Sequence, residues 1–341
     1  MQTIKTDYDI KIDQLKVLSV AEGFFGFSVL LALLKLKVFE SIGENGKKLN
    51  DIALSLDVQP GTLARLMNAG VVLNLLETSD GITYRVASAC RSVLLPSSGE
   101  HYLGNWIRNL EYFYLALSKL DEAVLKSGPT VDPSTSVGLD KEHTREFSLA
   151  MHNYASLRGK ELSRFLDTTG CRSLLDLGCG PGTYGYCLGM ANPDLELHLA
   201  DFPAVLEVAK EVRMMYPLKN KISYLPLDAV KDDIPGSYDM ILVSNTLHGL
   251  GESESRNLIR KLYGSINQGG SLVIQAQFLQ DDHRGGRWPV LLDIMMLCVT
   301  EKGRNHSVAE TKQWLEEACF SNIEFCPMTL LNTNCFLRGY N

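Results

Sequence analysis

The sequence predicts an α/β chain of two domains, a mainly helical amino-terminal domain followed by a domain built around a mostly parallel sheet. The chain has 341 residues, which is enough for two domains of roughly 150 residues each. Its composition, 45% apolar and 21% charged, is that of a folded globular protein. Apolar residues recur at helical spacing in the first part, whereas from residue 172 onward short apolar strands alternate with helices.

The first domain has the pattern of a winged helix. Residues 17–78 show helical periodicity interrupted by turn signals at 43–48 and 59–62, which predicts three short helices. Residues 76–86 (LETSDGITYRV) then place SDG between two short alternating runs, the signal of a β-hairpin.

The charge of this domain does not suit DNA. Arg65 is the only basic side chain between Thr62 and Leu76, where a recognition helix would lie. Residues 1–100 hold 10 basic and 11 acidic groups, and the whole chain has a formal net charge of −7. Phosphate contacts require positive charge, so we expect no nucleic-acid partner.

An apolar helical face follows at 102–126 (Tyr102, Trp106, Leu110, Phe113, Leu117, Leu120). It could be internal core, but so much apolar surface on a small helical domain favours a homodimer. A looser stretch at 127–140 and a helix at 141–166 connect the halves. The predicted organisation is a dimerisation domain at 1–130, a linker and connecting helix at 131–166, and a second domain at 167–341.

Membrane and metal partners are not expected. The longest apolar stretch, Phe24 to Leu34, is well short of the roughly 20 residues that cross a bilayer. The first residues mix acids with lysines, unlike a signal peptide, so we expect a cytoplasmic protein. The eight cysteines are scattered, without CxxC pairs or zinc spacing, and predict reduced thiols and no metal site.

A glycine loop marks the second domain. A buried strand at 172–177 runs into Gly178-Cys179-Gly180-Pro181-Gly182, and a helix follows at 184–190. Strand, glycine loop and helix form a nucleotide-type site, because glycine lets the backbone approach a ligand. One register, Gly180-x-Gly182-x-x-Gly185 with Asp201 21 positions after Gly180, fits a dinucleotide such as NAD. The other register, Asp176-x-Gly178-x-Gly180-x-Gly182, fits the loop of class I S-adenosylmethionine methyltransferases. It also accounts for the acidic residue, Asp176, that stands before the first glycine.

Three further strands each end in a polar residue. They are predicted at 195–200, 222–227 and 238–243, followed by Asp201, Asp228 and Ser244. Ligands bind at the carboxyl edge of an open parallel sheet, so Asp201 could accept ribose hydroxyls and Asp228 the adenine amino group. A single strand-terminal aspartate is more often a turn or helix cap.

Together these motifs resemble the class I S-adenosylmethionine-dependent small-molecule O-methyltransferases of the acetylserotonin and plant phenolic type. The resemblance extends from the winged helix through LLDLGCGPG, LADFPAVLE, VSNTLHGL, NQGGSLVI, LLDIMMLCVT and WLEEACF. It implies a winged-helix dimerisation domain before a Rossmann-like domain with a mostly parallel seven-stranded sheet. It also implies methyl transfer from S-adenosylmethionine to a hydroxyl of a small aromatic or polyketide-like natural product of secondary metabolism.

The resemblance assigns roles to residues. It implies His248 as general base, with an unperturbed pKa near 6.5. It implies substrate contacts for Phe147, Met151, Asp293 and Met296, which could equally be ordinary core residues. The cofactor-binding residues that it implies are Asp176, Gly178, Gly180, Gly182, Asp201, Phe202, Asp228, Ala229 and Ser244.

Two positions depart from the family. Ala276 and Asn305 stand where acids that orient the histidine are expected. Either the base is weak and the hydroxyl acidic, or Gln275, Gln277 or Asp293 replaces the acids, or the chemistry is not O-methylation. These departures leave N- or C-methylation and non-methyl chemistry on bound S-adenosylmethionine as rival functions. Two further rivals rest on other patterns: an NAD-dependent oxidoreductase on the Gly180 register, and a regulator that senses S-adenosylmethionine on the winged helix.

Overall fold

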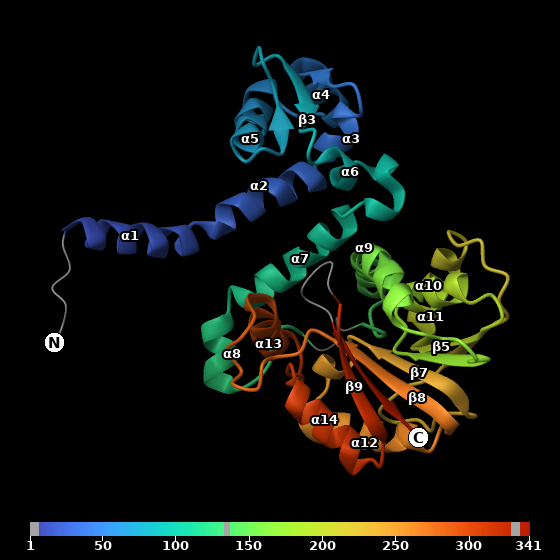
Figure 1. Ribbon diagram of the computed structural model, residues 1–341. Helices are drawn as coiled ribbons and strands as arrows, with labels where there is room; N and C mark the ends of the chain where they lie inside the picture. The colour runs from blue at the N-terminus through green and yellow to red at the C-terminus, as the bar shows by residue number, and fades with distance from the viewer. Residues whose placement is uncertain (1–6, 133–136, 329–334) are drawn as a thin grey trace. The chain divides into compact units, whose positions relative to one another are not determined.

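The computed structural model describes residues 7–132, 137–328 and 335–341. The chain divides into two compact units, Met1–Arg108 and Asn109–Asn341 (Figure 1). This division lies inside helix α7 (Gly104–Leu117), rather than at the predicted limits of 130 and 166. Those limits remain predictions about domains, and each unit is described here by itself.

The amino-terminal unit is helical with a small antiparallel sheet of order β1-β3-β2. The predicted hairpin is present as β2 and β3, but residues 17–78 hold more helices than the three expected, because Lys37 (φ 55°) and other short breaks divide the chain. Its elements are α1 (Asp7–Ala21), α2 (Gly23–Lys35), α3 (Val38–Ile42), β1 (Lys47–Lys48), α4 (Leu49–Leu56), α5 (Pro60–Val72), β2 (Leu76–Glu77), β3 (Thr83–Val86), α6 (Arg91–Leu94) and the 3-10 helix Pro96–His101.

The expectation that no apolar segment is long enough to cross a membrane is wrong by length and composition. Helices α1 and α2 follow one another almost without interruption, so Ile10–Lys35 forms a 26-residue segment with a window of mean hydropathy 2.1. Only 11% of that window is buried within the chain. A helix that packs against another protein subunit has the same properties, so this segment by itself is weak evidence for a membrane.

The second unit is an α/β layer structure. It contains α8 (Leu120–Lys126), α9 (Lys141–Phe165), β4 (Ser173–Leu177), α10 (Thr183–Ala191), β5 (Glu196–Asp201), α11 (Pro203–Arg213), β6 (Ile222–Pro226), β7 (Tyr238–Ser244), the 3-10 turn Leu247–Gly249, α12 (Glu252–Tyr263), β8 (Ile266–Ala276), α13 (Arg287–Val299), α14 (Val308–Glu317), β9 (Ser321–Pro327) and β10 (Cys335–Tyr340).

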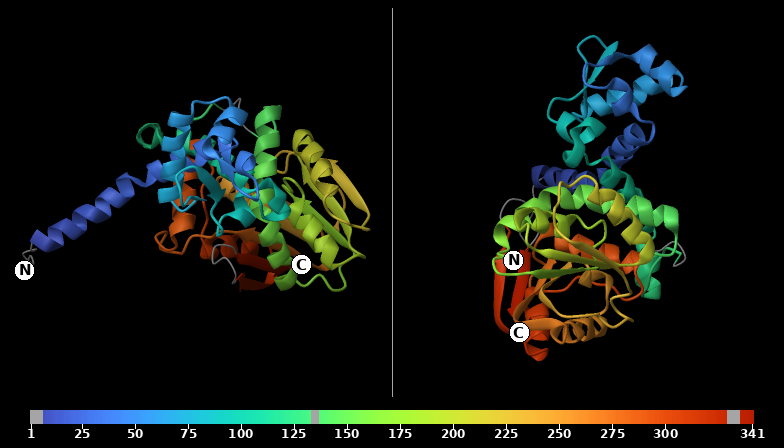
Figure 2. Two further views of the ribbon diagram at one scale, coloured as in Figure 1. Left: turned by 90° about the horizontal axis from the view of Figure 1, so that it is seen from above. Right: turned by 90° about the vertical axis from the view of Figure 1, so that its right-hand side faces the viewer.

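The sheet has the order β6-β5-β4-β7-β8-β10-β9. The first five strands are parallel, and β10 pairs antiparallel with β8 and β9. This confirms the predicted seven-stranded, mostly parallel sheet. Helices α9, α10 and α11 cover one face, and α12 and α14 cover the other (Figures 1 and 2).

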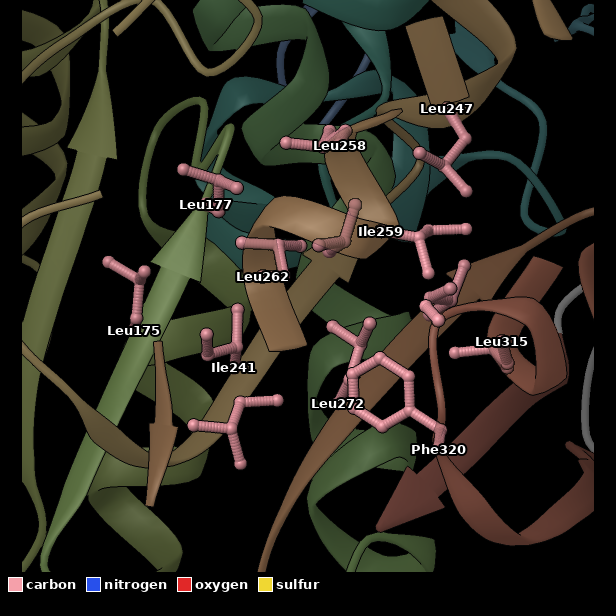
Figure 3. Close-up of a cluster of buried hydrophobic side chains, with 14 of the residues drawn as sticks. Leu175, Leu177, Ile241, Leu247, Leu258, Ile259, Leu262, Leu272, Leu315 and Phe320 are labelled. Atoms are coloured by element: carbon pink, nitrogen blue, oxygen red, sulfur yellow. The ribbon is translucent and has the colours of Figure 1, made fainter. Parts of the chain in front are cut away.

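Alternation along the strands builds the two cores. Leu175 and Ile241 face α12 and α14, where Leu258, Leu262 and Leu315 complete a buried cluster (Figure 3). Their neighbours Leu174 and Leu242 face α9, α10 and α11 on the opposite side. A central parallel strand is buried on both faces, which is why these strands read as continuous apolar runs in the sequence.

The parallel strands bring their carboxyl ends to one edge of the sheet. β4 ends at the glycine loop, β5 at Asp201, β6 just before Asp228, and β7 at Ser244. These ends agree with the predicted strands to within one residue. The candidate ligand-binding residues therefore share one edge, as an open parallel sheet requires.

Candidate active site

The glycine loop joins β4 to α10 in a conformation that favours glycine. Gly178, Gly180 and Gly182 all have positive φ, at 68°, 54° and 76°. A Cβ on Gly178 would lie 2.7 Å from the Thr246 hydroxyl oxygen, whereas a Cβ on Gly180 would meet nothing within 4 Å. The loop is thus packed at Gly178 and open at Gly180, where a ligand can approach the backbone.

Asp201 is hydrogen bonded to the loop. The Gly180 amide donates to Asp201 Oδ2 (2.8 Å), and the Phe202 amide donates to Oδ1 (2.7 Å). Burial raises the pKa of Asp201, and these two bonds oppose that shift. Phe202 caps α11 and is 38% exposed. Each carboxylate oxygen keeps a lone pair that can accept a ligand hydroxyl.

The Asp228 carboxylate contacts residues of the turn that follows β6. Its Oδ1 accepts from the Val230 amide (2.9 Å), and its Oδ2 pairs with Lys231 Nζ (3.0 Å). Burial favours a higher pKa for Asp228, but Lys231 and the turn amides outweigh it and lower the pKa. The Ala229 carbonyl accepts from Lys261 Nζ (3.0 Å). We call Asp201 and Asp228 the acidic edge.

Asp176 lies beneath the loop. Its Oδ2 accepts from the Gly185 amide in α10 (3.0 Å), and its Oδ1 is buried without a partner among the described residues. Burial raises the pKa of Asp176 to about 7, with a further contribution from Asp201. In this conformation Asp176 ties α10 to β4.

The segment after β7 carries His248. Ser244 Oγ donates to Gln275 Oε1 in β8 (2.7 Å), and Asn245 follows with a left-handed φ of 52°. His248 lies in the 3-10 turn Leu247–Gly249, half-buried, and its Nδ1 has no partner in the described part of the chain. Burial, with a smaller contribution from His306, lowers the pKa of His248 to about 4. The imidazole is therefore neutral at pH 7 and free to accept a proton.

The turn that carries His248 is held by the segment after α13. A Cβ on Gly303 would lie 2.7 Å from the His248 carbonyl oxygen, so the two backbones are in close contact. His306 Nε2 lies 3.1 Å from the Leu247 carbonyl and 3.3 Å from Ser255 Oγ. The His306 ring is buried and packs edge-on against Trp314 (4.9 Å between centroids). Sequence reasoning missed His306, although its position next to Asn305 was a signal.

The side chains considered as replacement partners for His248 point elsewhere. Gln275 accepts from Ser244, Gln277 Nε2 donates to the Tyr154 hydroxyl, and Asp293 Oδ1 accepts from the Asn305 amide (2.7 Å). Asn305 is buried, and its Nδ2 donates to the Gln277 carbonyl (2.7 Å). Asn305 therefore connects the segment after α13 to α13 itself and to the residue that follows β8 by hydrogen bonds.

The predicted substrate residues are only partly brought together. Phe147 from α9 and Met296 from α13 join one apolar cluster, whose other members include Phe113, Leu292 and Met295. Met151 is half-buried on α9, and Asp293 faces Asn305. The apolar cluster suits an aromatic ligand or a core equally, so these roles remain predictions.

Polar side chains behind the loop were also missed. Tyr154 on α9 accepts from Gln277, and the Arg158 guanidinium lies 3.6 Å from the centre of the Tyr154 ring. Tyr154 and Arg158 stand one helical turn apart, a spacing that could have indicated the pair.

Comparisons with known proteins agree with this geometry. The O-methyltransferase domain family matches residues 129–321, and the O-methyltransferase dimerisation domain family matches residues 18–96. The chain is 26% identical over 324 residues to the 3-hydroxy-5-methyl-1-naphthoate 3-O-methyltransferase of Streptomyces sahachiroi, covering 94% of this chain and 93% of the relative. It is 22% identical over 313 residues to the N,N-dimethyltransferase OxyT of Streptomyces rimosus, covering 89% and 90%.

Solved structures share the fold. Human N-acetylserotonin methyltransferase in complex with SAM superposes with a TM-score of 0.88 at 19% identity, covering 100% of this chain and 99% of that chain. PigF with SAH superposes with a TM-score of 0.86 at 23% identity, covering 96% and 99%. The helical unit, the mostly parallel sheet and the glycine loop are thus those of one known family, and the chain belongs to the O-methyltransferases with an amino-terminal dimerisation domain.

Proposed function

We propose that this protein transfers the methyl group of S-adenosylmethionine to a hydroxyl of a small aromatic or polyketide-like natural product. The observation that carries the proposal is the open glycine loop bonded to Asp201, in which Gly180 leaves space for a ligand and a carboxylate stands beside it. SAM and SAH are the ligands named for the human enzyme and PigF structures. A naphthoate 3-O-methyltransferase among the relatives supports a fused aromatic acceptor.

The residues present fit this methyl donor. Asp201 can accept the ribose hydroxyls, and the neighbouring Phe202, whose side chain is exposed, is proposed to contact the adenosine. When bound, S-adenosylmethionine supplies a methyl group that leaves its sulfonium as a thioether when the acceptor oxygen bonds to it. The chain therefore has to align the acceptor and remove its proton.

His248 is the proposed general base. Its neutral imidazole, whose Nδ1 is buried and unpartnered in the described residues, takes the hydroxyl proton as the new O–C bond forms and then releases it to water. A pKa of about 4 makes it a weak base, so we propose that the acceptor is an acidic hydroxyl such as a phenol or naphthol. Phe147 and Met296 are proposed to contact its ring.

A different acceptor atom is the second candidate. The weak basicity of His248 and the N,N-dimethyltransferase among the relatives both favour an amine, whose lone pair needs less activation by a base. The family match does not support hydride transfer with NAD or a role as a DNA-binding regulator.

Ligand titration followed by product analysis tests the proposal. Calorimetry should show micromolar binding of S-adenosylmethionine and S-adenosylhomocysteine and no binding of NAD. Incubation with trideuteromethyl-labelled S-adenosylmethionine and paired aromatic acceptors, one bearing a hydroxyl and one an amine, should then label the hydroxyl compound. Binding of NAD alone, or labelling only of the amine, would overturn the proposal.

The amino-terminal unit is proposed to form a homodimer. Leu15, Val17, Val20 and Phe25 on α1 and α2 are each at least 60% exposed, and Leu15, Gly26 and Leu73 line a hollow of about 510 Å³ in the same unit. Such an apolar surface on a dimerisation domain is expected to be covered by a second copy.

Sedimentation tests the dimer. The protein should sediment as a dimer, and Val20→Glu should produce monomer, whereas Lys16→Glu on the same helix should not. If wild type is monomeric but co-sediments with lipid vesicles, Ile10–Lys35 is a membrane segment instead, and the proposed cytoplasmic location falls with the dimer.

A further inference from the structure

Lys261 on α12 holds the turn that follows β6. Its Nζ donates to three backbone carbonyls of that turn, those of Ala229 (3.0 Å), Val230 (3.1 Å) and Asp232 (2.6 Å). An ammonium group has three N–H donors, so these contacts use its whole donor capacity. Three hydrogen bonds from one nitrogen thus join α12 to the turn.

The helix that carries Lys261 is itself fixed by packing. Leu258, Ile259 and Leu262 of α12 are buried in the apolar core that covers one face of the sheet (Figure 3). Lys261 stands directly before Leu262 and is half-buried. A side chain that starts from a packed helix holds its partners more precisely than one that starts from a loop.

The first residue of the turn is Asp228. The Lys231 and Asp232 amides donate to the Asp228 carbonyl (3.1 and 2.9 Å) and close the turn. The Asp228 amide donates to Asp232 Oδ2 (2.8 Å). The position of the Asp228 carboxylate therefore depends on the backbone of the turn, and Lys261 holds that backbone.

The two lysines at this turn contact different groups. Lys231 belongs to the turn, its side chain is 81% exposed, and it pairs with Asp228 Oδ2 (3.0 Å). An exposed ion pair contributes little free energy, so a ligand can take the place of Lys231. Lys261 binds neutral carbonyls and leaves the Asp228 carboxylate to other partners. Loss of Lys231 changes the charge beside the carboxylate, whereas loss of Lys261 releases the backbone that places it.

We propose that Lys261 is a positioning residue that makes the cofactor site selective for adenine. It holds the turn so that the Asp228 carboxylate accepts from the amino group of the base and rejects a base with a carbonyl oxygen there, because two acceptors would face each other. This rests on the proposed function, because it takes S-adenosylmethionine as the cofactor and Asp228 as its adenine contact. The same turn carries Ala229, so its displacement disturbs more than the Asp228 contact.

Calorimetry with two ligands tests the proposal without turnover. S-adenosylhomocysteine carries adenine, and S-inosylhomocysteine carries hypoxanthine, with an oxygen in place of the amino group. Lys261→Met should weaken S-adenosylhomocysteine binding about tenfold and leave S-inosylhomocysteine binding within about twofold of wild type. Lys261→Arg keeps the charge, but a planar guanidinium cannot direct three N–H groups from one nitrogen, so it should recover only part of the affinity. The exposed Arg260→Met on the same helix should match wild type.

Other outcomes overturn the proposal. An equal loss for both ligands would show that Lys261 has a purely structural role, and unchanged binding of both would show that the turn needs no anchor. If Lys261→Met does not fold, Lys261→Arg is titrated with the same two ligands, and an undiminished preference for adenine overturns the proposal. Equal affinity of wild type for the two ligands also overturns it, whereas failure of wild type to bind S-adenosylhomocysteine would instead refute the proposed function.

Discussion

The two sides of the glycine loop differ in how far their polar atoms are already paired within the protein. On the acidic edge the carboxylates already have protein partners, because Asp201 accepts two backbone amides and Asp228 holds a turn and Lys231. On the other side, His248 Nδ1, Arg158 Nε and Gln275 Nε2 are buried and unpaired in the described residues. The side proposed to bind the nucleotide is thus paired within the fold, whereas the side proposed to carry the reaction keeps buried atoms that a ligand can pair.

Removing His248 should produce the largest effect. His248→Asn keeps the polarity and approximate size of the side chain but removes the proton acceptor, so we expect kcat to fall about 10²- to 10⁴-fold. Binding of S-adenosylhomocysteine should be unchanged, because the acidic edge and the glycine loop are intact. Steady-state kinetics and calorimetry measure the two effects, and the exposed His283→Asn is the control. Near-normal turnover would remove general base catalysis from the reaction side.

The pH dependence of kcat/KM gives a second test of His248 as the base. Burial lowers the pKa of His248 to about 4, and the base is lost only when it becomes protonated. The acidic limb of kcat/KM in wild type should therefore lie near pH 4 to 5, rather than near the ordinary histidine value of about 6.5. A limb at 6.5 would show that His248 is solvated in the working enzyme.

The acidic edge is tested by comparing its two carboxylates. Asp201→Asn should weaken S-adenosylhomocysteine binding about 10- to 100-fold. Asp228→Asn should have a smaller effect, about threefold, because its carboxylate is occupied by the turn and by Lys231. Calorimetry with parallel thermal unfolding separates lost contacts from lost folding. An equal or larger effect at Asp228 would mean that the ligand displaces Lys231.

Replacing His306 should lower kcat moderately, because His306 holds the turn that carries His248. His306→Asn removes the contact with the Leu247 carbonyl and loosens the turn, so we expect kcat to fall about tenfold while KM changes little. Because the charge of His306 also helps to lower the pKa of His248, the acidic limb should move to higher pH. Reduced stability with an unmoved limb would mean that His306 is only a core residue.

Sequence patterns predicted the sheet better than the reaction site. Parallel strands buried on both faces leave continuous apolar runs, so the ends of β4, β5 and β7 could be placed to within one residue. The contact between Tyr154 on α9 and Gln277 after β8 was missed, because periodicity does not reveal which distant polar side chains meet. The length of Ile10–Lys35 was missed because one polar residue, Glu22, interrupts two consecutive helices.

The smallest predicted effect concerns Asp176, which belongs to the nucleotide side yet has an unpaired oxygen. Its pKa in the folded protein is about 7, well above the ordinary aspartate value of 3.8, so the unfolded chain releases the proton first. The contribution of protonated Asp176 to the free energy of unfolding is complete below pH 3.8, and it is lost as the pH rises toward 7. Asp176→Asn stays neutral and still accepts from Gly185, so it should be more stable than wild type at pH 8 by about 1 to 3 kcal/mol. Urea unfolding at pH 5 and pH 8 measures this, with the exposed Asp194→Asn as control. A variant less stable than wild type at pH 8 would show that the nucleotide side needs this charge, and the contrast between the two sides would then be weaker than the contacts indicate.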